Sequence, residues 1–302
     1  MDIIAQEWIE MQRNVQYRRT AALALKNEAE ARAFVDAVGF CFLWPIKGLE
    51  MPNLLHAIAG RAREVPAEHG DPDGSRCWGW KDRSLGQRWW YYGKLLARRA
   101  TLVSLDLLPY FYAHSSNYGD LNDYLQEYHD GTLTAEAKQI YEALLEHGPL
   151  DTVRLRKEAH LSAENAQARF ERALTDLQVG LKVLPVGVAE AGAWHYAFVY
   201  EIVQRHFPDL PERAREIGRG EAQRVLVQRY LDAVVAIDMA TIGRVFHTLN
   251  WSRAELERTI HTLLRSQSIV EVRTEREEHP LLMSARLMSV ARAEHPSSIG
   301  FA

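Results

Sequence analysis

Two stretches in the second half of the chain decide the fold: residues 162–178, SAENAQARFERALTDLQ, and residues 252–266, SRAELERTIHTLLRS. When Ser162 is laid over Ser252, apolar residues match at positions spaced i, i+4, i+7 and i+8. The matched residues are Ala166, Phe170, Ala173 and Leu174 in the first stretch and Leu256, Ile260, Leu263 and Leu264 in the second. This spacing predicts two helices that each bury one face. Each stretch opens with a serine that can cap a helix, and Ser252 and Glu255 have the spacing of a capping box.

Both stretches hold the third place in the same order of elements. Helical patterns at residues 134–146 and 151–159 precede the first stretch, and strands at 181–188 and 194–200 follow it, joined by the flexible segment 189–193. Helical patterns at 221–235 and 238–249 precede the second stretch, and a strand at 269–272 follows it. Three helices followed by a β-hairpin are the order expected of a winged helix, although ordinary helical bundles and dimerisation domains have similar patterns.

The sequence thus predicts an α+β, mainly helical protein with tandem winged-helix units. We expect five segments: an aromatic-rich N-terminal region at 1–130, a winged helix at 131–205, a linker at 206–220, a second winged helix at 221–275, and a tail at 276–302. Pro208 and Pro211 favour the linker. The tail has no sustained pattern and is expected to be partly disordered.

The third helix of the 131–205 unit carries the predicted DNA-binding face. Asn165, Arg169 and Arg172 are spaced i, i+4 and i+7 opposite the apolar stripe, as in a recognition helix that presents polar side chains to a DNA groove. A solvated helix face would have the same pattern. Further DNA contacts are expected from the preceding helix and from the hairpin, through Arg154, Arg156, Lys157, Trp194 and His195.

A second candidate surface lies in the aromatic N-terminal region. Residues 76–99 contain seven Lys or Arg and one acid, Asp82, interleaved with Trp78, Trp80 and the run 89–92, which we expect on a helix. Aromatic rings of this kind can stack on unpaired bases while arginines hold the phosphates. The alternative is that the 89–92 rings pack as core against an apolar strand at 101–108.

Acid–base chemistry would require a carboxylate near this aromatic region. Glu50 and Asp82 are the candidate catalytic residues, because a carboxylate beside apolar groups can activate water. Their spacing singles out neither residue. The other isolated groups nearby are Asp106, His56, His69 and His114.

Composition excludes several classes of protein. A net charge of −4 and a pI near 6.3 argue against a protein that coats nucleic acid without local positive patches. The chain has no Walker loop, dinucleotide fingerprint, His-Glu-x-x-His motif or serine-nucleophile elbow. Cys41 and Cys77 fit no metal spacing, so we expect buried thiols, no metal site and no cofactor. Without a long apolar stretch or signal peptide, a soluble, cytoplasmic protein with no membrane contact is expected.

The N-terminal region contains a recognisable sequence frame. Val38-Gly39-Phe40 leads into Phe42-Leu43-Trp44-Pro45. With this frame the chain, over roughly residues 20–270, resembles the bacterial winged-helix DNA glycosylases that excise alkylated or crosslinked purines, and especially their uncharacterised relatives. In the characterised enzymes, two polar residues stand where this chain has Phe42 and Trp44, and they position the attacking water.

The resemblance implies tandem winged helices around a concave DNA channel, including a winged-helix-like unit within residues 1–130. It implies double-stranded DNA, including alkylated or distorted duplex, as the partner. Phe42 and Trp44 cannot activate water but could stack on a base or a sugar. Base excision would then need another group, such as the carboxylate of Glu50 or Asp82.

Three functions remain open at this level. The first is DNA-damage recognition or repair, with or without base excision. The second is a transcription regulator whose aromatic region binds a small ligand while its winged helices bind an operator. The third is a protein-interaction module without affinity for DNA.

Overall fold

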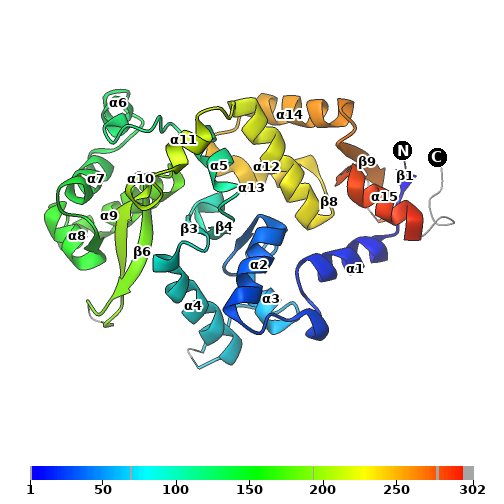
Figure 1. Ribbon diagram of the computed structural model, residues 1–302, viewed down its shortest axis with the longest axis horizontal. Coiled ribbons are helices and arrows are strands. Elements are labelled where there is room, and N and C mark those ends of the chain that lie inside the picture. The colour runs from blue at the N-terminus through cyan, green and yellow to red at the C-terminus, as the bar shows by residue number, and fades with distance from the viewer. Residues whose placement is uncertain (1, 69, 193, 277–278, 295–302) are drawn as a thin grey trace.

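The computed structural model describes residues 2–68, 70–192, 194–276 and 279–294 (Figure 1). Within these residues one order of elements, helix, strand, helix, helix, strand, strand, occurs three times. The N-terminal unit consists of α2 (Glu28–Val38), β2 (Phe40–Phe42), α3 (Leu54–Ala59), α4 (Pro72–Ser84), β3 (Tyr91–Lys94) and β4 (Ala100–Val103). The middle unit consists of α7 (Ala135–His147), β5 (Leu150–Asp151), α8 (Thr152–Glu158), α9 (Gln167–Val179), β6 (Val183–Ala189) and β7 (Ala197–Ile202). The C-terminal unit consists of α12 (Arg219–Val234), β8 (Ala236–Ile237), α13 (Met239–Phe246), α14 (Arg253–Arg265), β9 (Ile269–Arg273) and β10 (Leu281–Ser284).

The three sheets share one topology. In each unit the last strand lies in the middle and pairs antiparallel with both other strands, giving the orders β2-β4-β3, β5-β7-β6 and β8-β10-β9. In the C-terminal unit, β1 (Asp2–Ile3) extends the sheet by pairing parallel with β9. The chain is therefore α+β and mainly helical, as predicted.

Connecting elements lie between and around the units. They are α1 (Gln6–Gln16), α5 (Leu108–His114), α6 (Asp123–His129), α10 (Val203–His206), α11 (Leu210–Ala214) and α15 (Ala285–Glu294), with short 3-10 turns η1 (Ala21–Leu23), η2 (Leu85–Gln87), η3 (Leu96–Arg98), η4 (Glu164–Ala166) and η5 (His247–Leu249). In Figure 1 the middle unit lies on the left and the C-terminal sheet on the right, where β1 and α15 also lie.

Side-chain caps fix about half of the starts of the described helices. The side chains of Asn27, Asp71 and Thr134 accept bonds from the first turns of α2, α4 and α7, and Ser252 and Glu255 form the predicted capping box of α14. The prediction for Ser162 is wrong. The turn η4 closes with a bond from the amide of Ala166 to the carbonyl of Ala163, so α9 begins only at Gln167 and has no side-chain cap.

The segment 206–220 is not an exposed linker. It contains α11, and Phe207, Leu210 and Ala214 are buried in the largest core cluster. The two prolines do not keep the segment out of the core, because Pro211 takes the first turn of α11, where its missing amide hydrogen costs no helical bond.

Within residues 279–294 the tail is also more ordered than predicted. It supplies β10, the central strand of its sheet, and α15, which buries Leu287, Met288 and Ala291. Residues 295–302 lie outside the described part. No local pattern marks these elements, because β10 is stabilised by pairing with β8 and β9 rather than by its own periodicity.

The aromatic run 89–92 forms the start of a strand instead of a helix. Tyr91 and Tyr92 belong to β3, and Trp90, Tyr91 and Tyr92 are buried. The alternative that the aromatic rings of this run pack in the core is therefore correct for these three residues. Thr101–Val103 lie in β4 as expected of a strand, but the following residues turn into α5.

Phe40 joins the units at the centre of the largest core. Its ring lies 5.5 Å from Phe111 of α5, 6.4 Å from Tyr230 of α12 and 6.0 Å from Phe246 of α13, measured between centroids. The preceding Gly39 has φ +84°, and a Cβ there would lie 2.7 Å from the Cγ of Arg229. Glycine thus permits α12 to pack directly on the N-terminal unit.

Among the described helices, none combines the length and apolar character needed to cross a membrane.

Burial of His114 makes stability pH-dependent. Burial, followed by the nearby Arg219, lowers its pKa to about 4 from an ordinary 6.5. The unfolded chain therefore binds more protons as pH falls below 6.5, and stability is lost progressively between pH 6.5 and about 4. We expect a loss of about 2 kcal/mol from His114 by pH 5. Chemical denaturation at pH 7.5 and pH 5 measures it.

A His114→Gln variant should show a flatter pH profile than the wild type over this window. His129→Gln is the matched control, because the His129 side chain is 85% exposed and this change removes no buried imidazole. Equal slopes for His114→Gln and the wild type would contradict the assignment.

Candidate nucleic-acid interface

Three aromatic residues from two units form one cluster at the surface. Trp44 follows β2, Trp78 lies on α4, and Tyr196 immediately precedes β7 of the middle unit. The rings of Trp44 and Trp78 stack with centroids 6.4 Å apart, and Trp78 lies 5.7 Å from Tyr196. Trp78 is 40% exposed. This aromatic cluster of Trp44, Trp78 and Tyr196 therefore offers ring surface to a ligand.

Lys81 lies beneath the aromatic cluster and is fully buried. Its Nζ lies 3.9 Å from the centre of the Trp78 ring and 4.4 Å from that of Phe198. It donates to the hydroxyl of Tyr196 at 2.8 Å and to the Asp82 carboxylate. Burial lowers the pKa of Lys81, and the hydrogen bond to Asp82 opposes this shift. The rings of Trp78, Tyr92, Tyr196 and Phe198 and one carboxylate thus hold an ammonium group out of water.

The carboxylate of Asp82 sits at the edge of the aromatic cluster. Its Oδ1 accepts from Lys81 and, at 2.8 Å, from the hydroxyl of Tyr196, whose pKa is raised by burial and by this bond. The Asp82 side chain keeps 23% of its surface exposed. Asp82 is therefore a fixed negative group that a ligand on the cluster can reach.

Glu50, the other candidate carboxylate, has different partners. It lies 3.8 Å from Arg13 of α1, and its main-chain carbonyl accepts from Tyr230 of α12 at 2.7 Å. The negative charge of Glu50 also raises the pKa of the buried Tyr17, although burial is the larger cause. Glu50 thus contacts α1 and α12, whereas Asp82 contacts α4 and the middle unit.

The candidate histidines also have structural partners. His56 bonds to Asn53 and to the carbonyl of Arg63, and His114 packs on Trp251. His69 lies outside the described residues. Asp106 is exposed and lines a cavity beside α12, away from the aromatic cluster.

Two of the four proposed stacking residues cannot reach a base. Phe42 is 1% exposed and packs in the central core, and Trp80 is 5% exposed in the core under α4. Their side chains point inward because β2 is buried on both faces and Trp80 lies on the inner face of α4. Trp44 and Trp78 retain exposed surface.

Sequence reasoning missed Lys81 and Tyr196. Lys81 follows Trp78 by three residues, the helical spacing that brings two side chains to one face. The cation–π contact between them could therefore have been predicted from the sequence. The position of Tyr196 could not be predicted, because only the packing of the β6–β7 hairpin against α4 brings it to Trp78.

The predicted recognition face of the middle unit is exposed. Asn165 lies on η4 rather than on α9, and Arg169 and Arg172 lie on α9. Arg169 pairs with Glu136 of α7 at 3.0 Å, which reduces its positive field. Among the described residues, Arg172 has no ion-pair partner.

The neighbouring helix and the hairpin add further exposed groups. Arg154 and Lys157 on α8 are exposed, and Trp194, near the hairpin tip, is 90% exposed beside the exposed His195. A Cβ at Gly192 of the tip would lie only 3.6 Å from Val153 of α8, so the tip leans over that helix. Arg156 has a local role instead, because it donates to the carbonyl of Leu161 at 3.3 Å.

The basic run 76–99 does not form a continuous positive stripe. Arg76, Lys81, Arg83 and Arg98 each pair with a carboxylate, those of Asp73, Asp82, Glu28 and Asp176. Any phosphate contact from this run would come from its other members, Arg88, Lys94 and Arg99, which are exposed.

Comparison with known proteins shows that this architecture has relatives. The fold matches a solved structure, the Streptomyces sahachiroi DNA glycosylase AlkZ, with a TM-score of 0.52 and 13% sequence identity over 93% of this chain and 72% of that one. No curated protein sequence matches significantly. A family model described as AlkZ related matches residues 25–247, which include the frame around Gly39, the aromatic cluster and the whole middle unit. The chain therefore belongs to the AlkZ-related family.

Proposed function

We propose that this protein binds double-stranded DNA through winged-helix units and recognises sites where a base is displaced from the stack, as in alkylated or distorted duplex. The aromatic cluster carries this proposal. Two stacked indoles with exposed surface provide a platform for an unpaired base, and base–aromatic stacking contributes about 1–3 kcal/mol per base.

The middle unit supports the proposal through its shape. Three helices and a hairpin, with Arg172, Arg154 and Lys157 exposed, are the arrangement that lets a winged helix contact a groove and the backbone of DNA. The tip end of the hairpin, through Tyr196, is part of the aromatic cluster. A duplex held by the middle unit would thus lie close to the stacking platform. The matched structure is named a DNA glycosylase, which supports DNA as the proposed partner.

Base excision is the second candidate activity, favoured by the position of Asp82. Its Oδ1 is occupied by Lys81 and Tyr196, while Oδ2 has no hydrogen bond to any described residue. A carboxylate oxygen free to orient water, beside a platform for a displaced base, meets two requirements of N-glycosidic hydrolysis. Trp44 occupies one position at which the characterised enzymes carry a polar residue, so Asp82 would have to perform that role.

A gel-shift series with intact, abasic and N7-methylated duplexes tests both activities. We expect tighter binding to the abasic and methylated duplexes than to the intact one. Alkali treatment after incubation should then give strand breaks in methylated DNA only if bases are removed. Sequence-selective binding to intact DNA would favour the transcription regulator instead, and binding that is absent or independent of salt would contradict the proposal.

Reversal of the charges on α9 should weaken DNA binding. Because Arg169 and Arg172 are exposed on one face, Arg169→Glu/Arg172→Glu is expected to reduce affinity by about tenfold or more and to lower the salt dependence of binding. Filter binding at several salt concentrations measures both quantities.

Arg215→Glu is the matched control. Arg215 is 67% exposed and pairs locally with Glu212, away from the predicted face. Equal DNA affinity of the α9 variant and this control would contradict a role of α9 in DNA binding.

A further inference from the structure

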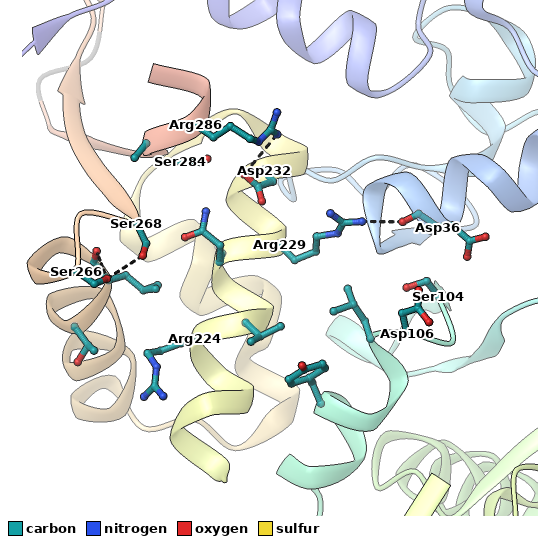
Figure 2. Close-up of a pocket in the computed structure, with 17 residues that line it drawn as sticks. Asp36, Ser104, Asp106, Arg224, Arg229, Asp232, Ser266, Ser268, Ser284 and Arg286 are labelled. Carbon is teal, nitrogen blue, oxygen red and sulfur yellow. Dashed lines mark hydrogen bonds and ion pairs between the residues drawn. The ribbon is translucent and has the colours of Figure 1, made fainter. Parts of the chain in front are cut away.

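A cavity of about 880 Å³ opens where α12 meets the N-terminal unit on one side and α14 and α15 on the other (Figure 2). Its size is typical of small-molecule sites. Its lining includes Asp36 and Asp106 at one side and Ser266, Ser268 and Arg286 at the other. None of these residues belongs to the aromatic cluster, so the cavity is a separate feature of the molecule.

The side of α12 facing the cavity is polar. Arg224, Gln228, Arg229 and Asp232 are spaced along one helical face and line the cavity, while Leu226, Val227, Tyr230 and Leu231 are buried on the other side of the helix. Gln228 Oε1 and Arg229 Nε are buried and have no hydrogen-bond partner among the described residues. Buried polar groups are normally satisfied, so the wall of the cavity contains one unpaired acceptor and one unpaired donor.

The α15 side of the cavity offers hydrogen-bond donors. Ser284 is fully buried, lines the cavity and directly precedes the ten-residue helix α15, yet its hydroxyl has no partner among the described residues. Ser266, Ser268 and Arg286 lie around it (Figure 2). The Arg286 guanidinium also lies 3.6 Å from the carboxylate of Asp232, so an acid group bound here would share it with Asp232. Serine hydroxyls, this guanidinium and a helix N-terminus together favour an acid group.

The opposite side offers acceptors. The carboxylates of Asp36 and Asp106 both lie there, next to the polar Ser104 (Figure 2). Burial and, to a smaller extent, the charge of Asp106 raise the pKa of Asp36, while Arg32 opposes the shift. Two carboxylates at the same side of a cavity favour a cation there.

Apolar side chains lie between the two polar sides. Leu107, Tyr110, Val225 and Leu263 line the middle of the cavity. The lining as a whole contains three arginines and three aspartates, so it has no net charge to attract a strand of nucleic acid. A ligand with opposite charges at its two ends fits this distribution better than a polyanion.

We propose that this cavity binds a short peptide or a similar zwitterion, with its acid group at Ser284 and Arg286 and its amine at Asp36 and Asp106. Peptide amides would pair with Gln228 and Arg229, and an apolar side chain would lie on Leu107. This binding site goes beyond the proposed action on DNA and does not depend on it.

Isothermal titration calorimetry with the free tetrapeptide Gly-Leu-Ala-Gly tests the proposal. We expect saturable binding at one site per chain. Acetylation of the amine and amidation of the acid group should each weaken binding at least tenfold, because each modification removes one charged contact. Inorganic phosphate alone should bind more weakly than the tetrapeptide.

Single substitutions test where the two charged ends of the tetrapeptide bind. Ser284→Ala should leave the stability of the ligand-free protein unchanged, since the hydroxyl has no partner to lose, but weaken tetrapeptide binding severalfold. Asp106→Asn should weaken binding of the free tetrapeptide and not of its acetylated form. Arg265→Gln, an exposed change on α14 outside the cavity lining, should change neither quantity.

Three outcomes would overturn the proposal: no saturable heat with the free tetrapeptide, equal affinity for the free and blocked forms, or displacement of the tetrapeptide by a DNA oligonucleotide. DNA affinity itself is measured in the gel-shift series, so failure of the peptide site leaves that result unaffected.

Discussion

Replacement of Asp82 by asparagine is expected to lower the free energy of unfolding by about 3–5 kcal/mol. The Lys81 ammonium is fully buried, and Asp82 is its only carboxylate partner among the described residues. Asparagine keeps the shape but removes the charge, so the ammonium would remain among aromatic rings without a counterion. Urea denaturation at pH 7 measures the loss.

The reverse change should cost less. Lys81→Met leaves Asp82 behind, but that side chain is 23% exposed and retains its bond from Tyr196, so water can solvate it. The double variant Lys81→Met/Asp82→Asn should be more stable than Asp82→Asn alone, because it removes the buried charge together with its partner. Equal stability of Asp82→Asn and the wild type would contradict the buried ion pair.

Because Asp82→Asn should destabilise the protein more than Lys81→Met, a test of Asp82 as a catalytic group needs a background without the buried ammonium. A loss of activity in Asp82→Asn alone could reflect unfolding. The comparison of Lys81→Met with Lys81→Met/Asp82→Asn separates the two effects, since both lack the buried ammonium and differ only in the carboxylate. Base excision retained by Lys81→Met and lost in the double variant would assign the chemistry to Asp82.

Loss of both indoles of the aromatic cluster should remove most of the preference for damaged DNA. Trp44→Ala/Trp78→Ala is expected to weaken binding to abasic duplex by roughly 10- to 100-fold, the effect of losing stacking on one displaced base. Binding to intact duplex should change much less, because it depends on the middle unit. Fluorescence anisotropy with both duplexes measures the difference.

Two controls accompany this variant. Trp78 also covers Lys81, so Trp78→Phe, which keeps an aromatic ring, tests whether a loss of binding comes from stacking or from disturbance of the buried ammonium. Tyr118→Ala removes an aromatic residue that is 88% exposed on the loop before α6 and should have no effect. An equal loss of affinity for abasic and intact duplex would exclude a stacking role.

Much of the helical architecture was predictable because its signals are local. The apolar stripes of α9 and α14 and the capping box at Ser252 depend on residues within one or two turns. The hairpin of the middle unit was predictable for the same reason, since β6 and β7 are neighbours in the chain. Interactions over short sequence distances leave patterns that a single sequence displays.

Of the candidate site, the sequence indicated the helical face with Arg169 and Arg172, the exposed Trp78 and the carboxylate of Asp82. It did not separate Trp78 from the buried Trp80, two positions further along α4. The seven basic residues of 76–99 looked like one patch because their carboxylate partners on other helices, such as Glu28 and Asp176, are distant in the chain.

The sequence by itself determined the capped, amphipathic helices and their order, because hydrogen bonds and side-chain periodicity within each segment specify them. Only the tertiary structure decided that the tail completes a sheet, that 206–220 enters the core, and that Trp44, Trp78 and Tyr196 meet over Lys81. These features depend on packing between segments tens to hundreds of residues apart. The free energy of such contacts comes from surfaces that become neighbours only when the whole chain has folded.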